Sequence, residues 1–300
     1  MPENLFRGIM PAIVTPFTEK NELDLAGMET NVKFYLECGV TGVVVNGSTG
    51  EASALTREER IETIKTAVKV VNGRGKVVAG AGAPTTGHAI GLARDAESAG
   101  ADAVLVLTPF SVIPTKEGLY SYFKEVSQAV DIPLIAYNLP QHTLVNLGVD
   151  TLSRLVDDGF VAGIKESSGN MSVFAQITKE LGTRISVLTG GDDLMLQSFI
   201  LGCSGAILAL GNIAPKLCVE LFKAVQGNDI AKSKDLYFRI LPVAQAIGSP
   251  ENFPAPVKEA VRLLGRPAGA CRSPILPLNV HERKALEDAL KEAGLLRVKG

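Results

Sequence analysis

The chain has 300 residues, of which 46% are hydrophobic and 21% charged, so it can bury a large core. Its 30 basic and 32 acidic side chains give a formal net charge of −2. This balance disfavours a nucleic-acid partner or an acidic membrane surface, because both need an excess of positive charge. No run of 18 or more apolar residues occurs, so we expect no membrane-spanning helix.

The four cysteines, Cys38, Cys203, Cys218 and Cys271, are far apart in the sequence. They form neither a C-x-x-C pair nor a cluster with histidine, so we expect no disulfide framework and no metal site. The first ten residues contain no apolar signal core. A reducing cytoplasm is therefore the expected compartment.

Eight short runs rich in Val, Ile, Ala and Leu follow one another along the chain with little polar alternation. This pattern is typical of strands that are covered on both faces, as in a parallel sheet. The predicted strands are residues 8–17, 42–47, 76–82, 101–109, 133–140, 160–168, 185–191 and 205–212.

Amphipathic segments separate these strands. In residues 56–71, and again in residues 116–130, apolar side chains recur at intervals of three and four, which places them on one face of a helix. Thr56 followed by Glu59 has the spacing of a capping box, because each side chain can satisfy a free N–H group of the first turn. The sequence thus predicts alternating strands and helices.

Eight strand–helix units over about 225 residues match the size of a (β/α)8 TIM barrel. A doubly wound open sheet is the competing architecture, although most open sheets need fewer units. No linker divides the chain, so we predict a catalytic barrel at residues 1–227 and a C-terminal helical extension of the same structural unit at residues 228–300. The extension carries helical patterns at residues 229–247, 255–264 and 280–293.

Polar side chains stand at three predicted strand ends, where barrel enzymes build their active sites. The second strand ends in GSTGE at residues 47–51, whose hydroxyls and turn N–H groups suit a carboxylate or carbonyl oxygen. A structural turn without a ligand is an equally good interpretation of this motif. On the fifth strand Tyr137 shares a face with Ile135 and is either a core side chain or a proton carrier.

Lys165 ends the apolar run of the sixth strand, on the same face as Val161 and Gly163. Lysine is rarely buried without a partner or a purpose, and desolvation favours the neutral amine, which is a nucleophile. The alternative is a lysine whose amine reaches water at the barrel mouth. An amine, a phenol and a hydroxyl turn at one mouth are what a Schiff-base lyase or aldolase requires.

Three motifs, GSTGE at 47–51, YNLP at 137–140 and GIKESSG at 163–169, resemble in order and spacing the dihydrodipicolinate synthase/N-acetylneuraminate lyase family. Its members are pyruvate-dependent class I aldolases with a (β/α)8 barrel, and the resemblance covers essentially the whole chain. It implies that Lys165 forms the Schiff base with pyruvate and that Tyr137 transfers protons.

The same resemblance implies a binding role for the turn at the second strand. Ser48 and Thr49, with Gly47 beside them, would bind the pyruvate carboxylate, and Thr49 would back the hydroxyl of Tyr137. Ile207 would line the pyruvate pocket through its main chain. A homotetramer built as a dimer of dimers, and chemistry without a metal or organic cofactor, are also implied.

Two positions depart from the pattern of the synthases within this family. His142, a candidate substrate-binding residue, stands where an Arg usually pairs with the second substrate's carboxylate, and histidine lacks the permanent charge and the fork of donors. Such a charge-assisted contact is worth about 1.5–3 kcal/mol. Ser111 stands where a Tyr usually crosses the subunit interface to complete the proton relay, and serine is too short for this. Both changes disfavour condensation with aspartate semialdehyde.

The leading hypothesis is a Schiff-base-forming lyase that reversibly joins or cleaves pyruvate and an aldehyde, acting on a 2-keto-3-deoxy sugar acid or on 4-hydroxy-2-oxoglutarate. The first alternative is a 4-hydroxy-tetrahydrodipicolinate (dihydrodipicolinate) synthase of lysine biosynthesis, with His142 or another basic residue in place of Arg. A keto-deoxy acid dehydratase and a non-catalytic keto-acid-binding homologue are also considered. A phosphosugar or flavin barrel would use the turns at residues 190–193 and 211–212, but the aspartates of the first turn repel phosphate.

Overall fold

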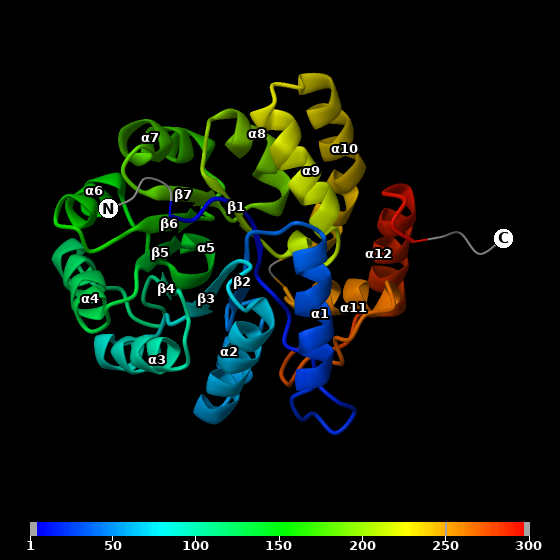
Figure 1. The fold of residues 1–300 in the computed structure, drawn as a ribbon, viewed down its shortest axis with the longest axis horizontal. Coiled ribbons are helices and arrows are strands. Elements are labelled where there is room, and N and C mark those ends of the chain that lie inside the picture. Colours follow the sequence, from blue (N-terminus) through cyan, green and yellow to red (C-terminus); the bar gives the residue numbers. More distant parts are fainter. Residues whose placement is uncertain (1–4, 250, 297–300) are drawn as a thin grey trace.

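Eight parallel strands form a barrel that is surrounded by helices (Figure 1). The structure is a computed structural model and describes residues 5–249 and 251–296. The strands are β1 (Gly8–Pro11), β2 (Gly42–Val45), β3 (Lys76–Gly80), β4 (Ala103–Leu107), β5 (Leu134–Asn138), β6 (Gly163–Glu166), β7 (Ser186–Thr189) and β8 (Gly205–Leu208). Each strand from β2 to β8 pairs with its neighbours in chain order, and β8 pairs with β1.

The first and second strands close the sheet. Ala12 forms a bridge with Val44, and the N–H of Ile13 donates to the Val44 carbonyl at 2.9 Å. On the other side of β1, the side chain of Asn212 accepts from the N–H of Val14 at 2.9 Å and donates to the Ala12 carbonyl at 2.7 Å. The predicted TIM barrel is thereby confirmed, and the open sheet is excluded.

Helices follow the strands as the periodicity predicts. The helices around the barrel are α1 (Leu25–Glu37), α2 (Arg57–Val71), α3 (Thr86–Ser98), α4 (Lys116–Gln128), α5 (Pro140–Thr143), α6 (Val149–Asp157), α7 (Met171–Leu181), α8 (Met195–Ile200) and α9 (Pro215–Gln226). Short 3₁₀ turns lie at Ala52–Ala54, Asp192–Leu194 and Leu210–Asn212. Thr56 and Glu59 form the predicted capping box at the start of α2.

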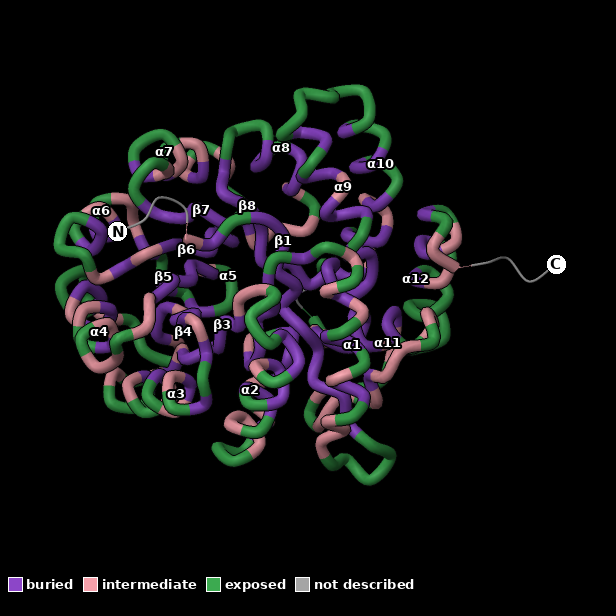
Figure 2. The backbone as a smooth tube through the Cα atoms, viewed as in Figure 1, coloured by how far each residue is buried: buried purple, intermediate pink, exposed green. Residues whose placement is uncertain are grey.

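Alternate residues of each strand face two different cores. One core fills the barrel interior, where Ile135, Tyr137 and Ile207 pack together. The other core lies between the strands and the helices and includes Ala136 from the same strand as Tyr137. Figure 2 shows the buried strands at the centre and exposed residues on the outer turns of the helices. The predicted alternation along the fifth strand is therefore confirmed.

The C-terminal extension consists of α10 (Ile230–Ile247), α11 (Ala255–Leu263) and α12 (Val280–Glu292), close to the predicted bounds. These helices gather on one side of the barrel, where α10 packs on α9 and α12 packs on α10 (Figure 1). The N–H of Phe17 donates to the Ala268 carbonyl at 3.1 Å and ties the extension to the loop after β1. The domain boundary at residue 227 stays a prediction.

The four cysteines are all free thiols, which agrees with the predicted lack of a disulfide framework. Over residues 5–249 and 251–296, none of the helices has both the length and the hydropathy that crossing a bilayer demands. In the same part of the chain, His, Cys, Asp and Glu side chains do not gather into groups of three or more that could hold a metal ion.

Candidate active site

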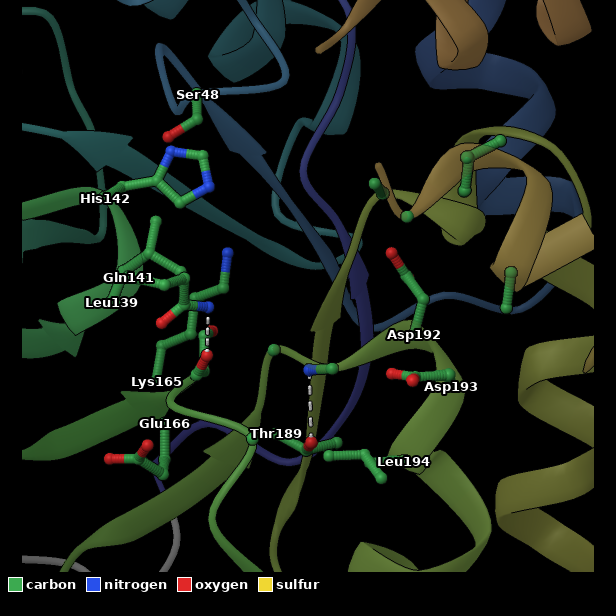
Figure 3. Close-up of a pocket in the computed structure, with 18 of the residues that line it drawn as sticks. Ser48, Leu139, Gln141, His142, Lys165, Glu166, Thr189, Asp192, Asp193 and Leu194 are labelled. Carbon is green, nitrogen blue, oxygen red and sulfur yellow. Dashed lines mark hydrogen bonds between the residues drawn. The ribbon is translucent and has the colours of Figure 1, made fainter. Parts of the chain in front are cut away.

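A cavity of about 620 Å³ opens at the C-terminal ends of the strands. Five residues that the sequence predicts as site residues line it, from β5, β6, α5 and the turn after β2: Ser48, Thr49, Tyr137, His142 and Lys165. Figure 3 shows Lys165 on one side of this cavity and Asp192 on the other. Residues that are far apart in the sequence therefore share one chamber, as the barrel topology requires.

Lys165 and Tyr137 are direct neighbours across β5 and β6. Each is only 7% exposed, and the Lys165 amine lies 4.1 Å from the centroid of the Tyr137 ring. Tyr137 lines the cavity, and among the described residues no hydrogen bond of its hydroxyl is found. An amine and a phenol thus meet in a largely desolvated place, with the hydroxyl left for a ligand.

The next cross-strand pair fixes this register from the opposite face of the sheet. The side-chain amide of Asn138 donates to one carboxylate oxygen of Glu166 at 2.9 Å, and the other oxygen accepts from the N–H of Ser168 at 2.6 Å. Figure 3 shows the Glu166 carboxylate pointing away from the Lys165 side chain. Successive strand residues face opposite sides of the sheet, so the Asn138–Glu166 pair holds the backbone of Tyr137 and Lys165 in register. The pair does not lie between the Tyr137 and Lys165 side chains.

The predicted binding turn at residues 47–51 is compact and hydrogen-bonded. The N–H of Gly50 donates to the Gly47 carbonyl and that of Glu51 to the Ser48 carbonyl, both at 3.1 Å. Ser48 is exposed at the cavity, while Thr49 is only 4% exposed. Within the described residues no hydrogen bond joins Thr49 to a tyrosine hydroxyl, so the backing role of Thr49 stays a prediction.

The remaining predicted site residues lie at different depths. His142 is exposed on α5, and Figure 3 shows its ring beside Ser48. Gly47 lines a second cavity of about 320 Å³, which shares Ser48, Tyr137 and His142 with the first. Ile207 is fully buried in the barrel interior and lines neither cavity with its side chain. A role for its main chain stays a prediction.

Asp192 is a site residue to which the sequence assigns no role in the lyase chemistry. Burial raises the pKa of its carboxyl to about 6, against a smaller lowering by the Leu210 N–H and Lys165. The Leu210 N–H donates to the Asp192 carboxylate at 2.9 Å. The signal in the sequence was the pair of aspartates after Gly190-Gly191, but only the folded chain shows that the first of them lines the cavity with Lys165.

Comparison with known proteins identifies the family. The model of the dihydrodipicolinate synthetase family matches residues 5–293. The chain belongs to this family. The 4-hydroxy-tetrahydrodipicolinate synthase of Methanocaldococcus jannaschii is 39% identical over 293 residues, which cover 97% of this chain and 100% of the relative.

Solved structures of the dihydrodipicolinate synthetase family agree with this assignment. The dihydrodipicolinate synthase of Acinetobacter baumannii, complexed with pyruvate, has a TM-score of 0.93 and 36% identity, and covers 97% of this chain and 99% of its own. The prophage protein YagE of E. coli K12, also in complex with pyruvate, has a TM-score of 0.92 and 32% identity, with coverage of 97% and 99%.

Family membership confirms the predicted enzyme class, a carbon–carbon lyase of the pyruvate-dependent class I aldolase type. It also bears on the choice between the hypotheses drawn from the sequence. The curated relatives are named as 4-hydroxy-tetrahydrodipicolinate synthases, so the comparisons favour that alternative over the broader lyase hypothesis.

Asp192→Asn should change how stability depends on pH. Below its ordinary pKa of 3.8 the carboxyl is protonated in both the folded and the unfolded chain; between that value and about 6 the unfolded chain releases the proton while the folded chain retains it, so stability is lost over this window. The free energy of unfolding should therefore fall in the unaltered protein relative to the variant, by about 1–2 kcal/mol between roughly pH 4 and pH 7.5. Urea unfolding at both pH values measures this.

A substitution that changes no ionisable group provides the control for this experiment. Ser249→Ala, at an exposed residue that lines the same cavity, should differ from the unaltered protein by the same amount at both pH values. A difference for Asp192→Asn that is equally constant with pH would contradict the assignment of a buried, destabilised carboxylate.

Proposed function

We propose that the protein uses Lys165 to form a Schiff base with pyruvate and then joins this to an aldehyde, as a 4-hydroxy-tetrahydrodipicolinate synthase. The observation that carries the proposal is the buried Lys165 amine 4.1 Å from the Tyr137 ring, at the mouth of a barrel of this family. The identity of 39% to a synthase along the whole chain supports the choice of reaction.

Schiff-base formation needs a neutral amine and a proton donor. The Lys165 amine attacks C2 of pyruvate, the carbonyl oxygen takes up a proton, and water leaves as the imine forms. The hydroxyl of Tyr137 lines the same cavity and would deliver this proton, because it has no other partner among the described residues. Loss of a proton from C3 then gives the enamine.

Carbon–carbon bond formation uses the same groups in a second step. The enamine carbon attacks the carbonyl carbon of the aldehyde, and the developing alkoxide takes a proton, for which Tyr137 is again the nearest phenol in the cavity. Water then attacks the imine carbon of the product, and cleavage of the carbon–nitrogen bond releases the 2-keto acid and restores the Lys165 amine. The reverse sequence cleaves the bond, so one set of residues serves both directions.

The carboxylate of pyruvate would sit at the turn formed by residues 47–51. Ser48 presents a hydroxyl at the cavity, and Thr49 lines the cavity beside it. Hydroxyl and N–H donors hold an anion in a fixed place without the mobility of a long charged side chain. Gly47 would let the backbone approach the ligand closely.

A second candidate function is a retro-aldol lyase acting on a hydroxylated 2-keto acid. It is favoured by His142 and Ser111, both exposed, at the two positions where synthases of this family usually carry Arg and Tyr. A polyhydroxylated or hydroxylated acceptor needs hydrogen bonds there and no fixed positive charge. The family resemblance also carries an expected homotetramer and a cytoplasmic location, and both stay predictions.

Borohydride trapping tests the Schiff base. Incubation with pyruvate and borohydride should leave a reduced pyruvate adduct on the peptide that contains Lys165, because reduction of the imine makes the bond permanent. Lys165→Ala should lose the adduct, whereas the exposed Lys69→Ala should keep it. Mass spectrometry of the digested protein provides the measurement, and a full adduct elsewhere in the chain would refute the proposal.

Two assays with the same enzyme preparation decide the second substrate. A synthase should consume pyruvate with aspartate semialdehyde much faster than it releases pyruvate from a panel of 2-keto-3-deoxy acids and 4-hydroxy-2-oxoglutarate. His142→Arg should then raise turnover with aspartate semialdehyde by about one to two orders of magnitude, since it adds a charge-assisted contact. Rapid pyruvate release from the panel with no condensation would instead establish the lyase, and binding without any turnover would establish the non-catalytic homologue.

Gly190→Ala should disable Lys165 while leaving the barrel intact. A methyl group at Gly190 would overlap the Ser167 hydroxyl and lie 2.6 Å from the Lys165 Cε atom, so the lysine would have to leave its position. The reduced pyruvate adduct on Lys165 should form at least about tenfold more slowly, as expected when a reacting group is displaced by about 1 Å. Gly191→Ala is the matched control, since its nearest contacts are Leu194 atoms at 3.3 Å. Equal trapping rates in the two variants would contradict this prediction.

A further inference from the structure

The turn at residues 47–51 is attached at its end to the C-terminal extension. Glu51, the last residue of the turn, has a φ of 54° in the left-handed region and is only 4% exposed. A non-glycine residue keeps this backbone conformation only where its surroundings hold it. Its side chain points to groups that lie more than 200 residues later in the sequence.

The principal partner of Glu51 is Lys258 on α11. The Lys258 amine lies 2.7 Å from one carboxylate oxygen of Glu51, donates to the Ala270 carbonyl at 2.9 Å, and lies 4.2 Å from the centroid of the Phe17 ring. The two side chains are 2% and 3% exposed. Among the ion pairs formed within residues 5–249 and 251–296, this is the only one with both side chains so deeply buried.

Arg272 holds the other side of the same turn. Its N–H donates to the second carboxylate oxygen of Glu51 at 2.8 Å. Its guanidinium donates to both carboxylate oxygens of Glu59 at 2.6 Å, and to the Ala54 carbonyl at 2.8 Å. The turn, the 3₁₀ segment after it and the start of α2 are therefore all bound to one stretch of the C-terminal extension.

Stability alone does not account for this arrangement. A buried ion pair loses much of its Coulomb energy to desolvation, and apolar residues of the same volume often stabilise a fold equally well. Burial lowers the pKa of Lys258 and the Glu51 carboxylate opposes that shift, as expected of a pair that stays charged only because its members meet. What a fully hydrogen-bonded pair adds is a fixed geometry.

We propose that Glu51 and Lys258 are positioning residues that hold Ser48 and Thr49 in the conformation that binds the carboxylate of the 2-keto acid. This inference rests on the proposed function of the turn. Glu51 follows Thr49 by two residues, and its N–H donates to the Ser48 carbonyl, so a change at its carboxylate displaces both hydroxyl-bearing residues. The helical extension is thereby part of the active site, although neither residue lines the cavity.

The double variant E51Q/K258M tests this role. It removes both charges with side chains of nearly the same length and leaves no unpaired buried charge. The pyruvate concentration that gives half-maximal trapping should rise about tenfold, a change in binding that one displaced set of hydrogen bonds explains. The trapping rate at saturating pyruvate should stay within about twofold, because Lys165 and Tyr137 are untouched. If the pair were merely structural, the double variant would have a lower melting temperature, but the half-saturating pyruvate concentration would not rise apart from the rate at saturating pyruvate.

The surface pair Lys69–Glu29 supplies the matched control. Its amine and carboxylate are also 2.7 Å apart, but Lys69 is 74% exposed, so E29Q/K69M should leave the half-saturating pyruvate concentration unchanged. Glu51→Asp is the second test variant, because it keeps both charges and so preserves the fold. Its shorter side chain cannot reach both Lys258 and the Arg272 N–H without moving the turn, so half-saturation should again rise.

The possible results separate the two proposals. If the unaltered protein forms no pyruvate adduct on Lys165, the proposed function fails and the positioning role fails with it. If it forms the adduct, and folded E51Q/K258M keeps the same half-saturating concentration, only the positioning role is overturned. Should the double variant not fold, an unchanged half-saturation in Glu51→Asp overturns the positioning role in the same way.

Discussion

The parallel register between β5 and β6 is the constraint on which the site depends. It sets Tyr137 directly opposite Lys165, and the same strand alternation sends Asn138 and Glu166 to the outer face, where they bond to each other. A shift by one residue would exchange the two faces and put a carboxylate into the barrel interior in place of the amine. The carboxylate–amide pair therefore protects the catalytic register as well as satisfying its own polar groups.

Local charges, and no broad field, shape the mouth of the barrel. The chain is nearly neutral overall, yet Lys165, Glu166 and Asp192 lie close together at strand ends. Their surroundings differ: the Glu166 carboxylate accepts hydrogen bonds from N–H donors, burial raises the pKa of Asp192, and the Lys165 amine faces an aromatic ring. A formal net charge of −2 provides no overall positive field that would attract an anion from a distance.

The sequence was sufficient where function depends on strand ends. Apolar runs locate the eight strands, and the barrel rule then brings the ends of the second, fifth and sixth strands to one mouth, which is where Thr49, Tyr137 and Lys165 lie. The predicted strands were longer than the observed ones, because the buried apolar runs continue beyond the residues that pair as strands. The pattern of apolar residues reports which residues are buried, and burial continues beyond the last residues that pair as strands.

Residues that act through contacts distant in the chain were not predictable in this way. Lys258 stands in an amphipathic helical pattern, where a lysine is normally a solvated side chain, and its partner is separated from it by 207 positions. The position of Asp192 likewise depends on the 3₁₀ turn after β8, because the Leu210 N–H of that turn donates to its carboxylate. Lys258 lies between Val257 and Glu259, and this local sequence gives no hint that its side chain is buried.

The residues around the mouth of the barrel differ in what holds them in place. Tyr137 and Lys165 are fixed by backbone pairing between β5 and β6, in a chain that is 39% identical to a synthase over 293 residues. Ser111 and His142 follow β4 and β5 and are both exposed; His142 lines the cavity from α5, whereas Ser111 is not among the residues that line it. Loops can change without disturbing the barrel, so members of one family can share the strands and still differ at the residues around the mouth. Similarity of the whole chain to the synthases is therefore compatible with the departures at Ser111 and His142.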